Sequence, residues 1–201
     1  PSSLSVFRSL SIFSWNLNGL RDIPSRFLKL SHIRKFAGFL KSDVILLQET
    51  HLDEISSACI SKFVNHFNWI FSPLQSPRQG FAIGIRKGKK YSFSGLPTFS
   101  SSGTFFSTIV NIHNKPIGVT NVYIPPCDIH TFNLHCSSLC HIPLSDISVI
   151  GGDFNDPSLR LSSKVDSALN RLGVSRMEFC GPTHGRGNQI DHIFIPLSFI
   201  P

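Results

Sequence analysis

Three acidic residues lie at the ends of, or inside, short apolar runs. Glu49 and Asp153 end two such runs, and Asp191 lies inside a third. A carboxylate in such a place is costly to bury unless it is paired or binds a metal ion. Each acid taken singly could cap a turn instead. The chain has only 12 Asp and Glu residues, so three in apolar runs together predict a site built from carboxylate oxygens, which suit hard divalent ions.

Amides and one phenol occupy comparable positions. Asn155 follows Asp153 by two residues, and Asn16 and Asn18 close an apolar run that breaks at a glycine. Tyr123 ends a run that two prolines stop. These side chains are expected beside the acids at the rim of a sheet, where α/β proteins bind ligands. For Tyr123, a buried hydroxyl bonded to a backbone carbonyl is the alternative.

Strands must hold these residues, and helices must cover the strands. Alternating or β-branched apolar runs predict strands over 9–16, 42–49, 67–71, 80–87, 145–153 and 189–195, with a hairpin of 104–113 and 115–123. Apolar residues at helical spacing predict helices over 25–41, 53–65, 128–144 and 162–172. We expect the first helix to be amphipathic. Gly151 and Gly152 should allow a close approach of backbone or ligand.

Two further segments could contact phosphate. Basic residues follow the strand over 80–87, where a solvated hairpin tip is the equal alternative. The turn-rich loop 180–188 carries three side chains that could bind a phosphate, namely Thr183, His184 and Arg186.

Composition limits the class of protein. The 201 residues carry a net charge of +7, which favours a polyanionic partner. No apolar run reaches the roughly 18 residues of a membrane span, and no signal peptide is evident, so an intracellular protein is expected. Five cysteines without paired spacing indicate free thiols. A zinc site is the weaker reading of the group Cys136, Cys140, His141, His130 and His135.

Five motifs, in order along nearly the whole chain, resemble the endonuclease/exonuclease/phosphatase superfamily. They are Ser-Trp-Asn-Leu-Asn-Gly-Leu (14–20), Leu-Leu-Gln-Glu-Thr-His (46–51), Asn-Val-Tyr-Ile-Pro (121–125), Gly-Asp-Phe-Asn (152–155) and Gln-Ile-Asp-His-Ile (189–193). Finer details look like the endonuclease domain of LINE-type non-LTR retrotransposons. Among them are Gly-Phe-Ala-Ile-Gly-Ile-Arg-Lys (80–87) and an amide at Asn18, where the DNA-repair branch usually has an acid.

The resemblance implies a fold. It is an α/β (α+β), DNase I-like four-layer sandwich, in which two mixed β-sheets pack face to face and helices flank them. Residues 1–201 would form a single domain of this kind that lacks its last strand or strands.

The resemblance also implies roles. Glu49 would hold Mg²⁺ (or Mn²⁺) with Asn16 nearby, and Asp153 would orient or deprotonate the attacking water. Asn155 would bind the phosphate, Tyr123 would contact it or stabilise its charge, and Asn18 would contact the substrate.

Asp191 would orient a catalytic His, which the family supplies from a Ser-Asp-His motif that this sequence does not reach. His192 should point to the opposite face of its strand. His184 is a conceivable substitute.

The implied function is a metal-dependent DNA endonuclease. We expect it to be intracellular and nuclear, and to share a polyprotein with a reverse transcriptase. The alternatives are an inactive nucleic-acid-binding remnant, and an abasic-site endonuclease or phosphatase of the same superfamily. We also expect the missing strand to leave a sheet edge unpaired.

Overall fold

The structure is a computed structural model, and it describes residues 10–20, 22–52, 54–72, 79–155, 159–177 and 191–197. One sheet, sheet A, has four strands in the order β1-β2-β4-β3. Its strands are β1 (Ile12–Asn16), β2 (Val44–Gln48), β3 (Phe67–Phe71) and β4 (Ala82–Arg86). β1 and β2 are parallel, whereas β4 is antiparallel to both of its neighbours. β1 therefore forms one edge of this sheet in the part of the chain that the structure describes.

The other sheet, sheet B, has seven strands in the order β10-β11-β9-β8-β7-β5, and β6 pairs with β7. β7 and β8 form the expected hairpin, and β9 is parallel to β8. The strands are β5 (Tyr91–Phe93), β6 (Thr98–Phe99), β7 (Phe105–Ile112), β8 (Lys115–Tyr123), β9 (Ser148–Asp153), β10 (Val174–Arg176) and β11 (Asp191–Pro196).

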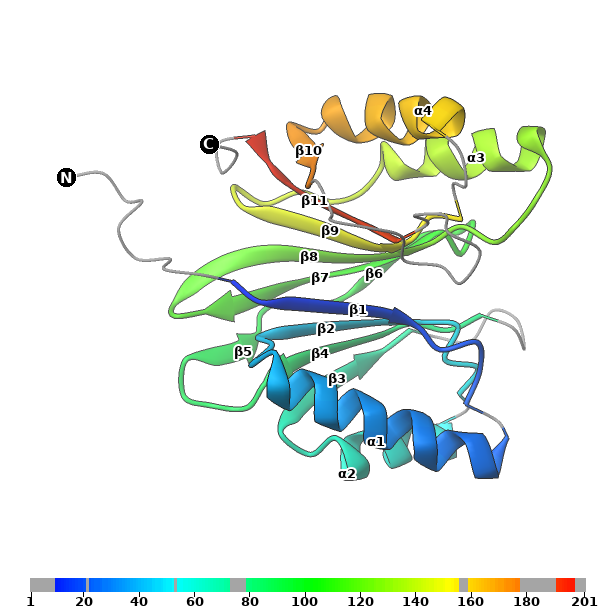
Figure 1. Cartoon of the computed structure of the whole chain (residues 1–201). Coiled ribbons are helices and arrows are strands. Elements are labelled where there is room, and N and C mark those ends of the chain that lie inside the picture. Colours follow the sequence, from blue (N-terminus) through cyan, green and yellow to red (C-terminus); the bar gives the residue numbers. More distant parts are fainter. Residues whose placement is uncertain are drawn as a thin grey trace.

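Helices cover the outer face of each sheet (Figure 1). α1 (Ile23–Phe39) and α2 (Glu54–Phe63) lie on sheet A, and α3 (Ile129–Leu139) and α4 (Leu159–Asn170) lie on sheet B. The molecule is thus a sandwich of four layers, helix, sheet, sheet and helix. This confirms the expected fold.

Strand alternation explains the layers. In β2 every residue is buried, because Ile45 and Leu47 face the core under α1 and α2, while Val44 and Leu46 face the core between the sheets. A third apolar core lies between sheet B and its helices, around Phe154. A strand buried on both faces reads as a continuous apolar run, which is how 44–47 appears in the sequence.

Two buried amides cross the layer between the sheets. Gln48 of β2 donates from Nε2 to Asn121 Oδ1 of β8 at 2.6 Å. Asn121 Nδ2 in turn donates to the Leu47 carbonyl at 2.9 Å and to the Ala82 carbonyl at 3.1 Å. Both side chains are fully buried, so these bonds connect sheet B to two strands of sheet A.

The two glycines of β9 allow the expected close approach. Gly152 has φ +148°, and a Cβ there would lie 2.0 Å from the Val122 carbonyl oxygen of the neighbouring strand β8. A Cβ at Gly151 would lie 2.9 Å from the Leu46 side chain of the facing sheet. Gly152 therefore allows β9 to pack closely against β8, and Gly151 allows the two sheets to pack closely against each other.

The predicted amphipathic character of the first helix is wrong in part. Among the α1 side chains that the structure describes, only Leu30, Ile33 and Ala37 enter the core. Other apolar residues of the predicted helix are at least 45% exposed, namely Phe27, Leu28, Phe36 and Phe39 of α1 and Leu40 just after it. A helix lying on a sheet buries one stripe of residues three or four apart, and the sequence has more apolar residues than that stripe can hold.

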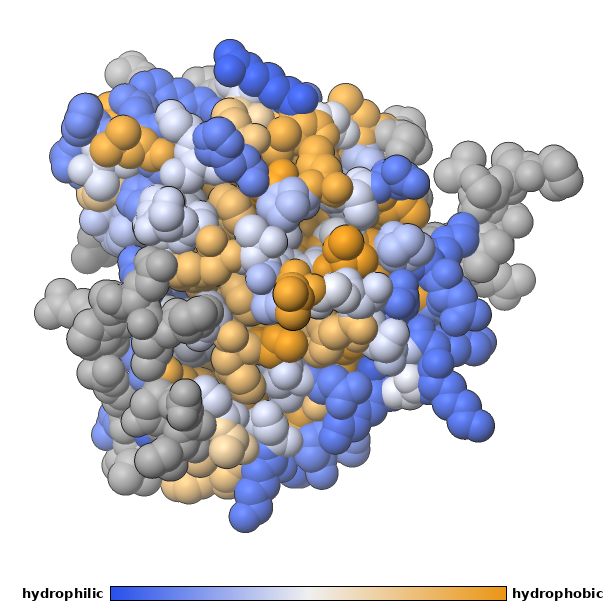
Figure 2. All heavy atoms as spheres, turned by 180° about the vertical axis from the view of Figure 1, so that it is seen from behind, coloured by the Kyte–Doolittle hydropathy of each residue, from blue (hydrophilic) through white to orange (hydrophobic). Residues whose placement is uncertain are grey.

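The surface is accordingly rich in apolar side chains. Seen from behind, hydrophobic residues gather in the middle of the molecular surface and hydrophilic residues lie around its rim (Figure 2). None of the described helices is long and apolar enough to cross a membrane.

The basic cluster after 80–87 lies far from the acids along the strands. β4 is antiparallel to β2 and pairs Ile85 with Val44, so Arg86 lies beside Asp43, at the other end of the sheet from Glu49. Arg86 donates to the Ser42 carbonyl at 2.7 Å and lies 3.8 Å from Asp43. Arg86 therefore lies away from the rim that carries Glu49, and the phosphate contact expected for the basic cluster stays a prediction.

Candidate active site

The polar residues singled out in the sequence meet at one end of the sandwich. Asn16 ends β1, Glu49 follows β2, and Tyr123 and Asp153 end the neighbouring strands β8 and β9. β11 runs antiparallel to β9, so its first residue, Asp191, lies opposite Asp153. Five strands from two sheets thus present their polar residues at the same rim, as the sequence predicted.

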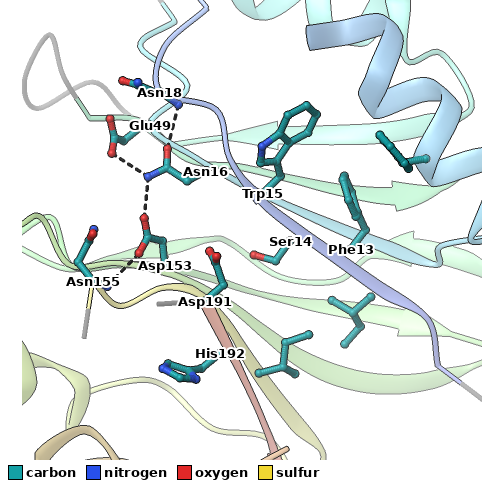
Figure 3. A pocket seen from close by; sticks show the side chains of 13 residues that line it. Phe13, Ser14, Trp15, Asn16, Asn18, Glu49, Asp153, Asn155, Asp191 and His192 are labelled. Atoms are coloured by element: carbon teal, nitrogen blue, oxygen red, sulfur yellow. Dashed lines mark hydrogen bonds between the residues drawn. The ribbon is translucent and has the colours of Figure 1, made fainter. Parts of the chain in front are cut away.

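Asn16 bridges the two central acids (Figure 3). Its Nδ2 donates to Glu49 Oε1 at 2.8 Å and to Asp153 Oδ2 at 2.7 Å. Its Oδ1 accepts a 2.9 Å bond from the backbone N–H of Asn18. The neutral Asn16 amide therefore holds two carboxylates close together, Glu49 after a strand of sheet A and Asp153 at the end of a strand of sheet B.

The second oxygen of Asp153 fixes Asn155. Asp153 Oδ1 accepts the Asn155 backbone N–H at 2.9 Å, and Asn155 Nδ2 donates to the Ile124 carbonyl at 2.8 Å. Asn155 has φ +44°, in the left-handed region that few residues other than glycine adopt. Its side chain lines the cleft beside Asp153 (Figure 3).

Tyr123 is almost fully buried, and its hydroxyl is hydrogen-bonded to Glu49. Burial first, and then this bond, raise the pKa of the phenol well above its usual range. The hydroxyl is therefore neutral and donates to the carboxylate. The alternative for Tyr123 was a hydroxyl bonded to a backbone carbonyl, whereas here the hydroxyl bonds the Glu49 side chain.

The turn after β2 holds Glu49 in an unusual conformation. Glu49 and His51 have φ angles of +47° and +52°. His51 Nε2 lies 3.5 Å from Glu49 Oε2. Such left-handed backbone costs about 1–3 kcal/mol per residue and clusters at functional sites. The sequence suggested no role for His51, since its contact with Glu49 depends on these two φ angles.

Asp191 and His192 lie as strand alternation predicts. Asp191 is partly exposed on the cleft, whereas the His192 ring is buried against Phe154 and Phe194. Neither ring nitrogen of His192 has a hydrogen-bond partner among the residues that the structure describes. Burial lowers the pKa of His192 to about 4, and the charge of Arg176 adds to the shift. His192 therefore does not serve as the histidine that Asp191 is expected to orient.

A cleft of about 710 Å³ opens from this rim between the edge strand β1 and β11. Its polar end holds Asn16, Asn18, Glu49, Asp153, Asn155 and Asp191, and its other lining residues are Ile12, Phe13, Ser14, Trp15, Phe36, His192 and Ile193. Asn18, the expected substrate contact, is exposed there. The site is open to a large substrate.

The remaining site predictions have two outcomes. Thr183, His184 and Arg186 lie outside the described residues. The zinc hypothesis is wrong, because the described residues, which include all five proposed ligands, contain no group of three that could hold a metal ion.

The residues present fit Mg²⁺. Glu49 and Asp153 offer carboxylate oxygens close together, and both bond the same neutral amide. Mg²⁺ is usually bound through one or two carboxylates, with water and substrate phosphate completing its shell. A site with few protein ligands at an open cleft suits that pattern.

Taken together, the fold and the site define a two-sheet sandwich with a centre of carboxylates and amides at one rim. Residues 13–199 match the endonuclease/exonuclease/phosphatase family, and the chain belongs to that family. Its enzymes generally use a divalent metal ion, typically Mg²⁺. Among curated proteins, no sequence match was found.

Several solved structures share the fold. TDP2 of D. rerio, complexed with a single-strand DNA product, is 15% identical, with a TM-score of 0.70 over 96% of this chain and 86% of that chain. An AP endonuclease from Archaeoglobus fulgidus is 17% identical, with a TM-score of 0.66 over 93% and 86%. A mannosyl-6-phosphatase of Bacteroides thetaiotaomicron is 14% identical, with a TM-score of 0.71 over 94% and 86%. Identities this low establish the fold alone, and the three names cover different substrates.

Proposed function

We propose that this protein is a Mg²⁺-dependent phosphodiester hydrolase that nicks DNA, as the endonuclease domain of a non-LTR retrotransposon. The observation that carries the proposal is the bridge by which Asn16 joins Glu49 to Asp153 at the mouth of the cleft. A phosphodiester is anionic and repels its nucleophile, so catalysis needs charge neutralisation and a base beside one another.

Each residue then has a distinct task. Glu49 holds the metal ion, with its carboxylate oriented by Asn16 and by the neutral Tyr123 hydroxyl. Asp153 accepts a proton from the attacking water, and Asn16 and Asn155 keep its two oxygens in place. Asn155 and Asn18 donate to phosphate oxygens in the cleft. When bound, the divalent ion supplies charge neutralisation at the phosphate.

DNA is the proposed partner. The net charge of +7 gives affinity for a polyanion without sequence specificity. The retrotransposon assignment is supported by the motifs at 46–51 and 121–125 and by Asn18 in place of an acid. We further propose a nuclear location and a reverse transcriptase on the same polyprotein.

A catalytic histidine oriented by Asp191 belongs to the same proposal. Asp191 lines the cleft and is partly exposed there, which leaves its carboxylate within reach of a histidine side chain.

One experiment distinguishes this proposal from its two alternatives, an inactive nucleic-acid-binding remnant and an abasic-site endonuclease or phosphatase. Purified protein is incubated with Mg²⁺ and three substrates: supercoiled plasmid, duplex DNA with one abasic site, and a soluble phosphate monoester. Glu49→Ala is the matched control for each substrate. Nicking of plain plasmid that Glu49→Ala abolishes supports the proposal.

Cleavage confined to abasic DNA or to the monoester would instead favour the repair or phosphatase alternative. DNA binding without cleavage of any substrate would favour the inactive remnant.

A further inference from the structure

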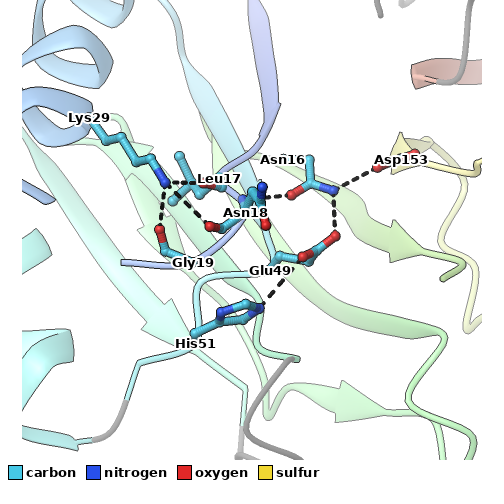
Figure 4. A network of polar contacts seen from close by, with 8 residues as sticks. All are labelled: Asn16, Leu17, Asn18, Gly19, Lys29, Glu49, His51 and Asp153. Atoms are coloured by element: carbon cyan, nitrogen blue, oxygen red, sulfur yellow. Dashed lines mark hydrogen bonds and ion pairs between the residues drawn. The ribbon is translucent and has the colours of Figure 1, made fainter. Parts of the chain in front are cut away.

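Lys29, in the second turn of α1, binds the loop that follows β1. Its ammonium donates to three successive carbonyls, those of Leu17 at 2.7 Å, Asn18 at 3.3 Å and Gly19 at 2.8 Å (Figure 4). A lysine has three N–H donors and no acceptor, so these three bonds use its whole capacity. Arg26, one turn earlier, donates to the next carbonyl, that of Leu20.

The loop needs such a partner because of its backbone conformation. Asn18 and Gly19 have φ angles of +48° and +82°. Two consecutive residues in this region turn successive carbonyls towards the same side. Three carbonyl dipoles facing one way repel one another, and a single cation offsets all three.

The other side of the same loop is bonded to the turn that carries Glu49. Gly19 N–H donates to the Glu49 carbonyl at 2.8 Å, and Leu20 N–H donates to the Thr50 carbonyl at 3.1 Å. The His51 ring packs so closely on Gly19 that a Cβ there would lie 2.5 Å from Nδ1. The loop is thus held between Lys29 on one side and the Glu49 turn on the other.

This loop also fixes the Asn16 side chain. The Asn18 N–H holds Asn16 Oδ1 at 2.9 Å, which aims Nδ2 at Glu49 and Asp153. A rotation of the Asn18 peptide would release Oδ1 and free the amide to turn. The conformation stabilised by Lys29 is therefore the one that places Asn16 between the two carboxylates.

We propose that Lys29 is a positioning residue of the active site: by binding the carbonyls of Leu17, Asn18 and Gly19, it holds the Asn16 amide between Glu49 and Asp153. In these three bonds the Lys29 ammonium contacts only backbone carbonyls and not the carboxylates of Glu49 and Asp153. Its effect on activity rests on the proposed function, whereas its effect on Asn16 does not.

The test compares Lys29→Met with Lys35→Met. Methionine keeps the length and apolar stem of lysine and removes the charge, and Lys35 is exposed on the same helix. The first measurement is the side-chain amide resonance of Asn16 in a ¹⁵N-labelled sample, assigned with Asn16→Asp. We expect it to shift or broaden in Lys29→Met and to stay in place in Lys35→Met.

The second measurement is the affinity for Mn²⁺, by calorimetry, and the third is kcat and KM for nicking at saturating Mg²⁺. Substitution of residues that orient metal ligands typically lowers metal affinity or activity by about 10–100-fold. We expect Lys29→Met to lower the Mn²⁺ affinity and the nicking activity within that range. Lys29→Arg should recover only part of the loss. Arginine keeps the positive charge, but its planar guanidinium cannot donate to three converging carbonyls as an ammonium does.

A lowered Tm with an unmoved Asn16 resonance and unchanged Mn²⁺ affinity would overturn the proposal and leave Lys29 a stabilising residue only. If the wild-type protein nicks no DNA while the Asn16 resonance still moves in Lys29→Met, the positioning role stands and the proposed function fails.

Discussion

Asn16 and Asp153 are 137 residues apart in the sequence and are joined by a 2.7 Å hydrogen bond. Asn16 ends the edge strand of sheet A, and Asp153 ends β9 within sheet B. The bond therefore exists only when the two sheets have packed. Folding of the sandwich and assembly of the candidate active site are the same event.

The first prediction concerns the proposed base. Asp153→Asn keeps the shape and one oxygen of the side chain but cannot accept a proton from water. We expect the nicking rate to fall at least about 100-fold, the range typical of general-base removal. Asp146→Asn, at an exposed acid just before the same strand, is the control and should keep its rate. Near-normal activity of Asp153→Asn with an unchanged Tm would remove Asp153 from this role.

The second prediction concerns the metal. EDTA should abolish nicking, and added Mg²⁺ or Mn²⁺ should restore it. Glu49→Gln keeps a hydrogen-bond acceptor for Asn16 and Tyr123 but loses the charge that binds a hard cation. We expect its half-saturating Mg²⁺ concentration to rise about 10-fold or more, measured from rate against Mg²⁺. An identical Mg²⁺ curve for wild type and Glu49→Gln would contradict the assignment.

The third prediction concerns the two-strand contact at Gly152. Gly152→Ala would place a Cβ 2.0 Å from the Val122 carbonyl oxygen at φ +148°. We expect a loss of about 3 kcal/mol or more in the free energy of unfolding. Gly38→Ala, where a Cβ meets nothing within 4 Å in helix α1, should gain about 0.5–1 kcal/mol. Urea titrations of both variants test this, and equal effects would show that the contact is not rigid.

The fourth prediction concerns acid stability. His192 is buried and neutral, with its pKa lowered from 6.5 to about 4. The unfolded chain binds this proton below pH 6.5, whereas the folded one does so only near pH 4, so stability must fall as the pH drops through that window. We expect His192→Phe to remove about 3 kcal/mol of this dependence.

The same variant should be more stable at pH 7 by about 1 kcal/mol, because it removes two buried nitrogens that have no partner in the described part of the chain. His141→Gln, at an exposed histidine, is the control for the titration. Unfolding by urea at several pH values measures both effects. An acid dependence that persists in His192→Phe would assign it to other groups.

The sequence predicted the long strands, the helices and the rim that carries Glu49, Asp153 and Asp191. β2 and β9 are buried on both faces and the other long strands at least in part, so their apolar patterns are visible without knowledge of their partners. The short strands β5, β6 and β10 were missed, because two or three residues become a strand only through pairing with β7 or β11. α4 also begins earlier than expected, at Leu159 instead of residue 162. Asp166 in this helix pairs with Arg176 of β10 at 2.8 Å.

The candidate site was predicted as a set of residues but not as a network. Motif positions indicated Asn16, Tyr123 and Asn155, yet which atom bonds which depends on the backbone. Lys29 gave no signal, since a lysine on a helix is usually solvated. Its role follows from the φ angles of Asn18 and Gly19, which no pattern of residue types reveals.

Apolar layers alone would let two stacked sheets slide, because one aliphatic contact serves almost as well as the next. The paired amides of Gln48 and Asn121 are different, since they are satisfied in only one alignment. These bonds fix the alignment of the two sheets, and the rim residues Glu49 and Tyr123 lie one and two residues further along the chain. A substitution such as Asn121→Leu could therefore leave a compact, folded protein whose two half-sites no longer face each other.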